Sequence, residues 1–464
     1  MVNRRAFLAR TGTAALGVAA SGCAGARLVR GSPDPWRGRD AVLARIRPPA
    51  FPDRTYRISD FGARGDGRSD AREATLRAIA RCNADGGGRV AVPAGTWWMG
   101  GPLHLKSNVE LHLEAGAVVR FTPDPARYLP PVLTRWEGTE VFAPSPFVYA
   151  YAAENVALTG PGTFDGNAAE TFWPWRDRQR DDQQALRRMG ADGVPVYERV
   201  FGEGHVLRPS FVQFFGCRNV LIDGPTFETS PFWVLHPVFS SNVTVRNVRV
   251  HSLNLNNDGV DVDSCTDVLI ERCVFETGDD AVALKSGRDR DGWRVGRPTE
   301  NVVVRDCLMR PRVNALTIGS EMSGGVRNVY VEHLRVEGEA DSALYFKANL
   351  DRGGIVEDVF VRDVEVESAR TLLHFTTDYA GYRGGQAPPT FRRFEVSDVT
   401  CARAGTALVA LGIEAAPIED VRLRRITVRQ ANETMRLRHV RGVDAEDVTV
   451  NGAPLRVPAS TGAL

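Results

Sequence analysis

The sequence has little net charge, few cysteines and histidines, and few long apolar runs, and each shortage excludes a class of protein. The 464 residues carry a net charge of +1, which argues against electrostatic binding of nucleic acid and leaves an acidic polymer open as a substrate. The seven cysteines include no CxxC pair and the eight histidines show no metal-ligand spacing, so no motif points to a metal or another cofactor. Beyond the N-terminal segment, no stretch is long enough to span a bilayer.

The first 23 residues have the features of an export signal. Arg4 and Arg5 precede a run of small and apolar residues, as in twin-arginine signals. Cys23 ends a segment that resembles a lipoprotein processing box, except that Ala20 stands where Leu is more usual. We therefore expect export to the periplasm or the exterior, with or without a lipid anchor through Cys23. A non-specific basic amphipathic start is the plain alternative.

The middle of the chain repeats a short strand pattern. Four segments align: NDGVDVDS (257–264), DDAVALKS (279–286), VNALTIGS (313–320) and DSALYFKA (341–348). Apolar residues alternate within each segment, which is typical of strands. Aligned positions recur after 22, 34 and 28 residues (258 to 280, 280 to 314, 314 to 342). A period in this range predicts a solenoid whose coils bury one continuous core.

A second signal marks the later coils. An Asn or Asp followed by Val recurs where a turn leads into a strand, and Asn and Asp tolerate the unusual backbone angles of such turns. The first residues of these pairs are Asn219, Asn242, Asp267, Asn301, Asn328, Asp358, Asp398, Asp420 and Asp447. We therefore predict an all-β fold, a single-stranded parallel β-helix over 54–455, after a linker (24–53) and before a tail (456–464).

A short helix is expected at the N-terminal end of the β-helix. Residues 69–84 have helical spacing, with Ser69 or Asp70 as the N-cap and Gly86 beyond the last turn. Such a helix would cover the unpaired strand edges and the exposed core at the open end of a solenoid. Early strands are predicted at 89–92, 109–113, 118–121 and 156–159.

Two polar excursions interrupt the repeat, at 168–208 and 376–391. The first carries Trp173 and Trp175 next to a charged run. These rings can stack on sugars beside a groove or pack within a surface loop. An excursion that blocks one end of the groove would favour cleavage from a chain terminus (exo action), but the sequence leaves exo and endo action open.

Cys273 and Cys307 occupy the same place in two repeats, DVLIERC and NVVVRDC. They are therefore expected to stack on neighbouring coils. A disulfide is one outcome in an exported protein. Small buried side chains in a ladder are the other.

Three carboxylates stand at the start of two neighbouring repeats: Asp258, Asp279 and Asp280. Asp258 and Asp280 each lie two residues before a valine that faces inward, so in an extended strand both side chains would also point inward. Burial of two carboxylates in the core would carry a large free-energy cost. We expect the chain to bend there instead, at Gly259 and Gly278. All three carboxylates then meet in one groove, because coils lie about 4.8 Å apart. When carboxyl groups lie close together, their pKa values move apart, so that one group stays protonated while another is ionised. Such a pair can serve as the general acid and the general base of glycoside hydrolysis. Asx turns or a polar ladder are the plain alternative.

Further motifs carry a resemblance to a known family. They are DFGARGDGRSD (60–70), VPAGTW (92–97), GPLHLKSNVELHLEAGA (101–117), SPFWVLHPV (230–238), NNDGVDVDSC (256–265), TGDDAVALKSGRDRDG (277–292), GSEMSGGVRNVYVE (319–332) and LYFKAN (344–349). Over about 56–365 the chain resembles glycoside hydrolase family 28, the polygalacturonases, and in particular their bacterial and plant-like exo-acting branch. The resemblance implies a right-handed parallel β-helix that hydrolyses α-1,4 bonds of galacturonan with inversion.

The resemblance also implies a role for individual residues. It suggests Asp279 as the general acid, with Asp258 and Asp280 activating water. Lys347 would bind a uronate carboxylate.

Two positions depart from the family pattern. Val313 stands where the family has His. The replacement removes a hydrogen bond that can adjust the pKa of a carboxylate. Tyr345 stands where the family has Arg, which removes bidentate carboxylate recognition. We expect hydrolysis to survive on an altered substrate, with Tyr345 stacking on a less acidic sugar.

Other side chains are candidates for substrate binding. Lys285 and Arg288 lie near the Asp pair in the sequence and suit an anionic sugar, although lysines and arginines are more often solvated surface charges than ligands. His236, which aligns with Asp263 in an outward column, and His374 can also reach the groove.

The leading hypothesis is an exported, monomeric glycoside hydrolase that needs no metal and acts on galacturonan or a related glycan such as rhamnogalacturonan. A carbohydrate-binding β-helix that has lost catalysis is a second hypothesis. A pectin-type lyase with a calcium site and a structural adhesin are weaker ones.

Overall fold

The computed structural model describes residues 34–381, 383–458 and 460–461. Residues 35–464 form one compact unit. The predicted export signal, with Arg4, Arg5 and Cys23, lies outside the described residues. No helix among the described residues is long and apolar enough to cross a membrane.

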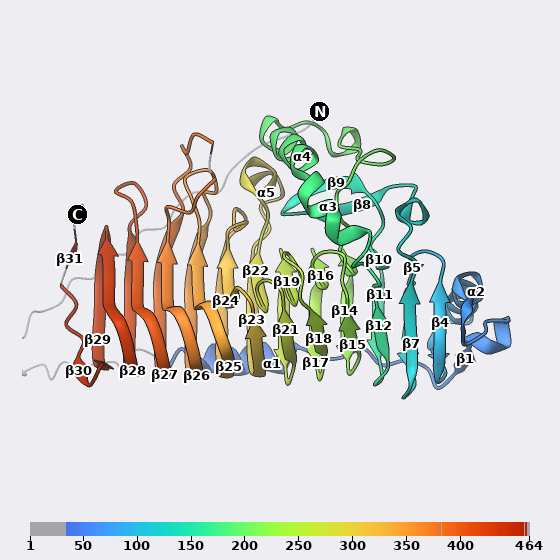
Figure 1. The fold of residues 1–464 in the computed structure, drawn as a ribbon, viewed down its shortest axis with the longest axis horizontal. Coiled ribbons are helices and arrows are strands. Elements are labelled where there is room, and N and C mark those ends of the chain that lie inside the picture. Colours follow the sequence, from blue (N-terminus) through green and yellow to red (C-terminus); the bar gives the residue numbers. More distant parts are fainter. Residues whose placement is uncertain (1–33, 382, 459, 462–464) are drawn as a thin grey trace, which may run out of the picture. The chain divides into compact units, whose positions relative to one another are not determined.

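Most of the unit 35–464 winds into a parallel β-helix, which confirms the predicted fold (Figure 1). Strands of successive coils pair in parallel in three ladders. The first ladder consists of β3 (Gly88–Val92), β6 (Val109–Leu113), β11 (Glu154–Thr159), β14 (Arg218–Asp223), β17 (Ser241–Arg246) and β20 (Thr266–Glu271). The second consists of β4 (Gly95–Met99), β7 (Ala117–Phe121), β12 (Thr163–Asp165), β15 (Thr226–Glu228), β18 (Arg249–Ser252) and β21 (Val274–Thr277). The third consists of β5 (Leu103–His104), β10 (Val148–Tyr151), β13 (Val212–Phe215), β16 (Leu235–Val238), β19 (Val260–Asp263), β22 (Val282–Lys285) and β24 (Asn314–Gly319).

Later coils join these short strands into long ones that run round the corners. These are β23 (Thr299–Pro311), β25 (Val326–Lys347), β26 (Ile355–Thr376), β27 (Thr390–Leu411), β28 (Ile418–Arg438) and β29 (Val440–Val450). In the third ladder Val260 pairs with Val282, Val282 with Leu316, and Leu316 with Leu344. The register is therefore the one that the four aligned repeats predict.

The Asn and Asp residues at the repeated turns adopt the left-handed conformation. All nine predicted positions, from Asn219 to Asp447, have φ between 53° and 59°. Their side chains also bond from coil to coil: Asn242 donates to Asn219 at 2.7 Å, and Asn219 donates to Asn155 at 2.8 Å. These residues therefore shape each corner and link it to the next.

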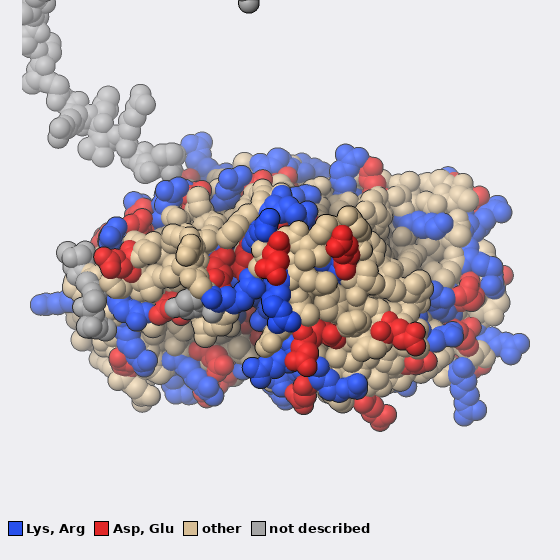
Figure 2. All heavy atoms as spheres, turned by 90° about the horizontal axis from the view of Figure 1, so that it is seen from above, with Lys and Arg blue, Asp and Glu red and all other residues tan. Residues whose placement is uncertain are grey.

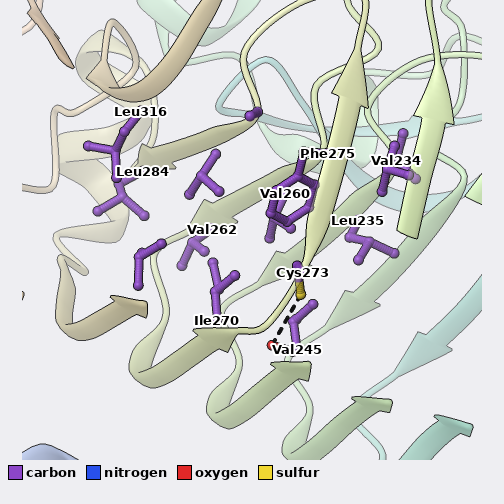
Figure 3. Packing of buried hydrophobic residues seen from close by; sticks show 14 of the residues in the cluster. Val234, Leu235, Val245, Val260, Val262, Ile270, Cys273, Phe275, Leu284 and Leu316 are labelled. Carbon is purple, nitrogen blue, oxygen red and sulfur yellow. Dashed lines mark hydrogen bonds between the residues drawn. The ribbon is translucent and has the colours of Figure 1, made fainter. Parts of the chain in front are cut away.

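The interior is one continuous hydrophobic core (Figure 3). Val260 and Val262 of β19 point inward with Phe275 and Leu284, and all four are fully buried. Cys273 donates a weak hydrogen bond to the carbonyl of Val245 rather than forming a disulfide. All six cysteines that the structure describes are free and buried.

The N-terminal end is closed by a helix, as expected. α2 (Arg72–Ala84), which follows β2 (Asp66–Asp70) in the chain, inserts Ala78 and Ile79 into the main core, beside β1 (Thr55–Arg57) and the short η1 (Ile58–Phe61). The helix begins at Arg72 rather than at residue 69, and the Asp70 carboxylate accepts a hydrogen bond from the Arg72 backbone N–H.

Part of the predicted linker is ordered. α1 (Trp36–Arg45) packs Trp36 and Val42 against Tyr330 on the outer face of the coils, and Arg39 pairs with Glu332 at 2.7 Å. The Arg- and Pro-rich composition of 24–53 hides this helix, because only a few apolar residues form its contact. The predicted tail contains β31 (Ser460–Thr461), which pairs antiparallel with β29, as does β30 (Ala453–Pro454).

A cover of helices lies over the third ladder (Figure 1). It consists of the hairpin β8 (Val132–Trp136) and β9 (Thr139–Ala143), the helices α3 (Phe172–Arg178), α4 (Arg180–Asp192) and α5 (Asp289–Val295), and the short turns η2 (Pro125–Tyr128) and η3 (Val196–Glu198). Trp136, Leu186 and Trp233 belong to its own small core, which joins the cover to the coil surface below. The predicted excursion at 168–208 is therefore the central part of a larger structure.

Candidate active site

Asp258, Asp279 and Asp280 meet in one cavity of about 350 Å³ beneath the cover. One carboxylate oxygen of each lies within 4.8 Å of the others. Asp258 precedes β19, and the two neighbouring aspartates precede β22, so each side chain leaves the chain at a bend, as the parity argument predicted. The cavity is lined by Glu137, Gln183, Arg187, Trp233, Asn256, Asp258, Asp279, Asp280, Lys285, Arg288, Ser320, Glu321, Lys347, Arg352, Tyr379, Ala380 and Gly381.

The two glycines at these bends act through space rather than through backbone angle. A Cβ on Gly278 would lie 1.9 Å from the carbonyl oxygen of Asn254, and one on Gly259 would lie 2.4 Å from that of Ala281. Neither glycine has a left-handed φ. They are therefore required because two backbone segments pass very close to each other beside the carboxylates.

Asp279 is the most accessible carboxylate of the trio. Its oxygens accept hydrogen bonds from the backbone N–H groups of Asn256 (3.0 Å) and Asp280 (3.1 Å). Burial and the neighbouring Asp280 outweigh these bonds and raise the pKa of Asp279 to about 6. The group can therefore hold a proton in mildly acidic solution and release it during a reaction.

Asp280 is held by a cation and an amide. Lys347 Nζ lies 3.5 Å from one carboxylate oxygen, and the Asn314 amide donates to the other at 2.6 Å. Asn314 follows Val313, the position where the family His is missing. A neighbouring amide thus supplies a hydrogen bond to a carboxylate of the trio in this chain.

Asp258 is buried, 3 % exposed, and interacts electrostatically with a further carboxylate, that of Asp261. Burial and then the charges of Asp261 and Asp279 raise the pKa of Asp258 well above its ordinary value. Asp261 is fully buried, and burial also raises its pKa although Lys285 Nζ lies 3.5 Å away. Both effects favour the protonated form of Asp258.

The trio also has the geometry of a cation site, since three carboxylate oxygens this close suit a divalent ion. Lys347 beside Asp280 and Lys285 beside Asp261 supply positive charge at the same place. Asp280 of the trio therefore has a side-chain cation as its partner, as does the neighbouring Asp261.

Lys285 and Arg288 reach the cavity as predicted, but both are buried and paired. Lys285 lies 4.6 Å above the Trp233 ring and 3.3 Å from Glu321. Arg288 pairs with Glu321 and, at 3.6 Å, with Glu137. Burial opposes ionisation of Glu321, but Arg288 and Lys285 hold the pKa of this carboxyl well below its usual range.

Arg187 and Arg352 complete the cationic wall. Arg187 of α4 donates to Glu137 at 2.6 Å, and Arg352 Nε donates to the carbonyl of Ser320 at 2.8 Å. Sequence reasoning missed both arginines, together with Glu137, since they come from segments with no repeat pattern. The charged run around Arg187 was the one available signal.

His236 takes a different place from the one expected. Val238, not His236, pairs with Asp263, so the alignment was displaced by two residues. His236 is 1 % exposed and does not line the cavity; its Nδ1 faces the amide nitrogen of Gln213 at 2.9 Å. Arg135 of the cover pairs with Asp263 at 2.8 Å. The cover therefore buries the column of side chains that contains Asp263, although this column faces outward from the coils.

Tyr345 and His374 stack on each other at 4.2 Å, in the predicted register. Tyr345 lies outside the residues that line the cavity, and Lys347 Nζ is 5.0 Å from its ring centroid. Tyr345 therefore contacts the lysine beside Asp280, and one face of its ring is already covered by His374.

Comparisons with known proteins agree with this geometry. The sequence model of Glycosyl hydrolases family 28 matches residues 202–449, which contain the trio. A probable polygalacturonase of Vitis vinifera is 27 % identical over 81 % of this chain and 74 % of its own length. The exo-poly-alpha-D-galacturonosidase of Dickeya chrysanthemi is 25 % identical over 74 % of this chain and 61 % of its own length.

A solved structure covers nearly the whole described unit. The hyperthermoactive exopolygalacturonase of Thermotoga maritima has a TM-score of 0.87 and 42 % identity, and the match covers 90 % of this chain and 96 % of that one. The resemblance drawn from the sequence motifs is confirmed. The chain belongs to glycosyl hydrolases family 28.

Proposed function

We propose that this enzyme hydrolyses galacturonan, or a related uronate-containing polysaccharide of pectin, at the trio of Asp258, Asp279 and Asp280. The observation that carries the proposal is one cavity that holds both an acid–base cluster and five cationic side chains. The polygalacturonase relatives support the same substrate class.

The charge balance of the cavity favours an acidic sugar. Five cations line it, namely Arg187, Lys285, Arg288, Lys347 and Arg352, against five carboxylates. The pKa values of two of these carboxylates, Asp258 and Asp279, are raised, which favours their neutral forms as the solution becomes more acidic. The cavity then carries more positive than negative charge, and a uronate carboxylate restores the balance. This surplus offsets the loss of the family Arg at Tyr345.

The proposed reaction divides the work between the carboxylates. Asp279 donates its proton to the glycosidic oxygen as the bond from that oxygen to the anomeric carbon breaks. A water molecule held by Asp258 and Asp280 attacks the anomeric carbon and gives its proton to Asp280, which faces the Lys347 cation. Atoms and charge balance, and the products are two shorter sugars.

The spacing of the trio bears on stereochemistry. Inverting enzymes usually separate acid and base by about 6.5–9.5 Å and retaining enzymes by about 5–5.5 Å, whereas oxygens here lie within 4.8 Å. We nevertheless propose inversion, because both oxygens of Asp280 are engaged by Lys347 and Asn314, which suits a base better than a nucleophile. Proton NMR of the first-formed anomer decides this, and a retained configuration would make a carboxylate the nucleophile.

Substitution of the acid tests the function. We expect Asp279→Asn to reduce release of reducing sugar from polygalacturonate by about 100- to 10,000-fold. An aryl galacturonide whose leaving group needs no proton should still be cleaved by Asp279→Asn but not by Asp280→Asn. Equal reducing-sugar release by wild type and Asp279→Asn on every pectic glycan would instead support the binding-only alternative.

We also propose that the chain is exported by the twin-arginine route, on the basis of Arg4 and Arg5, and works in the periplasm or outside the cell as a monomer. Replacing both arginines by lysine should leave the enzyme in the cytoplasmic fraction. Unchanged fractionation would exclude this route, and labelling with a radioactive fatty acid would reveal acylation at Cys23.

A further inference from the structure

The cover contains a separate cavity of about 260 Å³. This cavity shares no lining residue with the catalytic one. Its walls come from η2, the residue after β9, α3 and residues 202–206. The cavity therefore lies among segments with no repeat pattern, and the proposed reaction uses none of its residues.

Much of the lining of this cover cavity is apolar. Pro125 and Leu129, at the two ends of η2, line it together with Pro144 and Val206. The backbone N–H of Val206 donates to the carboxylate of Asp182 in α4 at 2.7 Å, which fixes the loop to the cover. A concave apolar surface that is held in place suits the C–H faces of a small ring.

Trp175 supplies a hydrogen-bond donor to the cover cavity. Its side chain is 8 % exposed, and its ring packs against Phe172 at 5.2 Å. The indole N–H has no hydrogen-bond partner among the described residues, yet it is not sealed from solvent. Because a buried indole N–H usually has a partner, this donor is available to a ligand in the cavity.

The polar part of the lining consists of Arg178, Glu203 and His205, all three exposed. Within the described part of the chain, neither Arg178 nor Glu203 makes an ion pair. The Nδ1 atom of His205 faces Asp182 at 2.8 Å, so Nε2 is left for a ligand. Arg178 and Glu203 contribute one charge of each sign, in contrast to the five cations of the catalytic cavity. Viewed from above, Lys and Arg side chains gather near the middle of the molecule, and uncharged atoms predominate beside them, toward the N-terminal coils (Figure 2).

We propose that the cover cavity binds one neutral sugar, such as a galactosyl residue on a side branch of the polysaccharide. A neutral sugar combines apolar C–H faces with hydroxyl groups that both donate and accept hydrogen bonds, and the lining offers a partner for each. A uronate carboxylate gains little here, because Glu203 opposes the attraction of Arg178. The use of the site rests on the proposed function: a branched polymer held at the cover has a raised effective concentration at the catalytic cavity.

Direct binding of small probes tests the proposal. Calorimetry measures the binding of methyl β-D-galactoside and, separately, of methyl α-D-galacturonide to the full chain carrying Asp279→Asn. We expect Trp175→Phe to weaken binding of the galactoside about fivefold, the size of one lost hydrogen bond, and to leave binding of the galacturonide unchanged. Trp173→Phe is the matched control. Trp173 lies on the same helix outside the cavity, and its N–H donates to the carbonyl of Ser230 at 2.8 Å.

Two further measurements address the chemistry of the ligand. Cyclohexanol has the size of a sugar ring but a single hydroxyl, so it should bind the cover cavity more weakly than the galactoside. Glu203→Lys makes the lining basic and should add a second binding site for the galacturonide, which raised salt weakens. Thermal unfolding checks that each variant is folded. If Trp175→Phe does not fold, Glu203→Ala at an exposed position takes its place and should also weaken binding of the galactoside.

The outcomes separate this inference from the proposed function. Absence of galactoside binding, equal effects of Trp175→Phe and Trp173→Phe, or equal affinity for cyclohexanol and the galactoside overturns the sugar site. Galactoside binding through Trp175 in an enzyme that hydrolyses no pectic glycan overturns the proposed function and leaves the sugar site standing. Hydrolysis of polygalacturonate without galactoside binding has the opposite meaning.

Discussion

At the residue scale, the catalytic chemistry depends on a carboxyl group whose ordinary pKa is too low for its task. Burial and Asp280 raise the pKa of Asp279 to about 6, so it is protonated below this pH and loses its proton above it. A general acid is active only while protonated. We therefore expect kcat/KM on polygalacturonate to fall about tenfold per pH unit above roughly pH 6.

The pH profile has an internal control. An aryl galacturonide with a good leaving group does not require the acid, so its profile should lack this descending limb. A polymer profile that stays flat to pH 8 in the wild-type enzyme would contradict the assignment of Asp279 as the acid.

A buried arginine ties the catalytic acid to the cover. Arg208 is fully buried, and its guanidinium donates to the side chains of Gln179 (3.0 Å) and Asn256 (2.7 Å). It makes no ion pair within the described residues, and burial lowers its pKa to about 10. Because the backbone N–H of Asn256 donates to Asp279, Arg208 positions the loop that stabilises the Asp279 carboxylate.

Arg208→Gln should therefore affect the pH profile as well as the rate. Loss of the contact between Arg208 and Asn256 weakens the hydrogen bond from Asn256 to the ionised form of Asp279. The pKa of Asp279 then rises, and the descending limb of the pH–activity profile moves to higher pH. We expect kcat/KM near pH 5 to fall about tenfold, the size of one lost charged hydrogen bond. Arg176→Gln, at a half-exposed arginine of α3, is the control. If Arg208→Gln lowers the yield of folded enzyme but leaves the descending limb of the pH profile at the same pH, the role of Arg208 is purely structural.

At the element scale, the cover decides how a polymer can enter. The β8 side of the hairpin and α3 lie over the coils before β19, and α4 lies over the catalytic cavity, which its residues Gln183 and Arg187 line (Figure 1). The small core with Trp136, Leu186 and Trp233 fixes them there. A fixed obstacle on one side leaves room for a chain end rather than for the middle of a chain. We expect exo action.

Product sizes test this expectation. Early digestion of long polygalacturonate should release only short products while viscosity falls slowly. Mid-length fragments in the first minutes would show that the polymer threads past α4. The same assay on a family relative named as an endo-polygalacturonase provides the reference pattern.

The elements that repeat could be predicted from the sequence, and the elements that do not repeat could not. Alternating apolar residues and the Asn/Asp-Val turns specify coil, register and corner, since each coil obeys the same local rules. The trio was predictable because it belongs to that repeat. Glu137, Arg187 and Arg352 were not, because they reach the cavity through the cover and loops, whose placement depends on long-range contacts. His236 was misplaced because its segment was aligned two residues out of register, so that Val238 and not His236 pairs with Asp263.

At the scale of the whole β-helix, stability is distributed along one axis. Each coil pairs with the coil before it and the coil after it, so local damage spreads only through neighbours. The N-terminal cap α2 lies several coils away from the trio, whereas β24 is the coil directly beside it. In a solenoid of this kind the terminal coils can unfold while the coils that carry the active site remain folded.

Two matched substitutions test that idea. Ile79 of α2 and Ile318 of β24 are both fully buried, so Ile→Ala at either site should cost about 2–5 kcal/mol. On gentle heating, Ile79→Ala should expose the N-terminal coils to protease while hydrolysis of polygalacturonate persists. Ile318→Ala should lose both together, since Ile318 pairs with Leu284 on the strand that follows the catalytic pair. If Ile79→Ala loses its resistance to protease and its hydrolytic activity at the same temperature, the coils unfold as one cooperative unit rather than one after another.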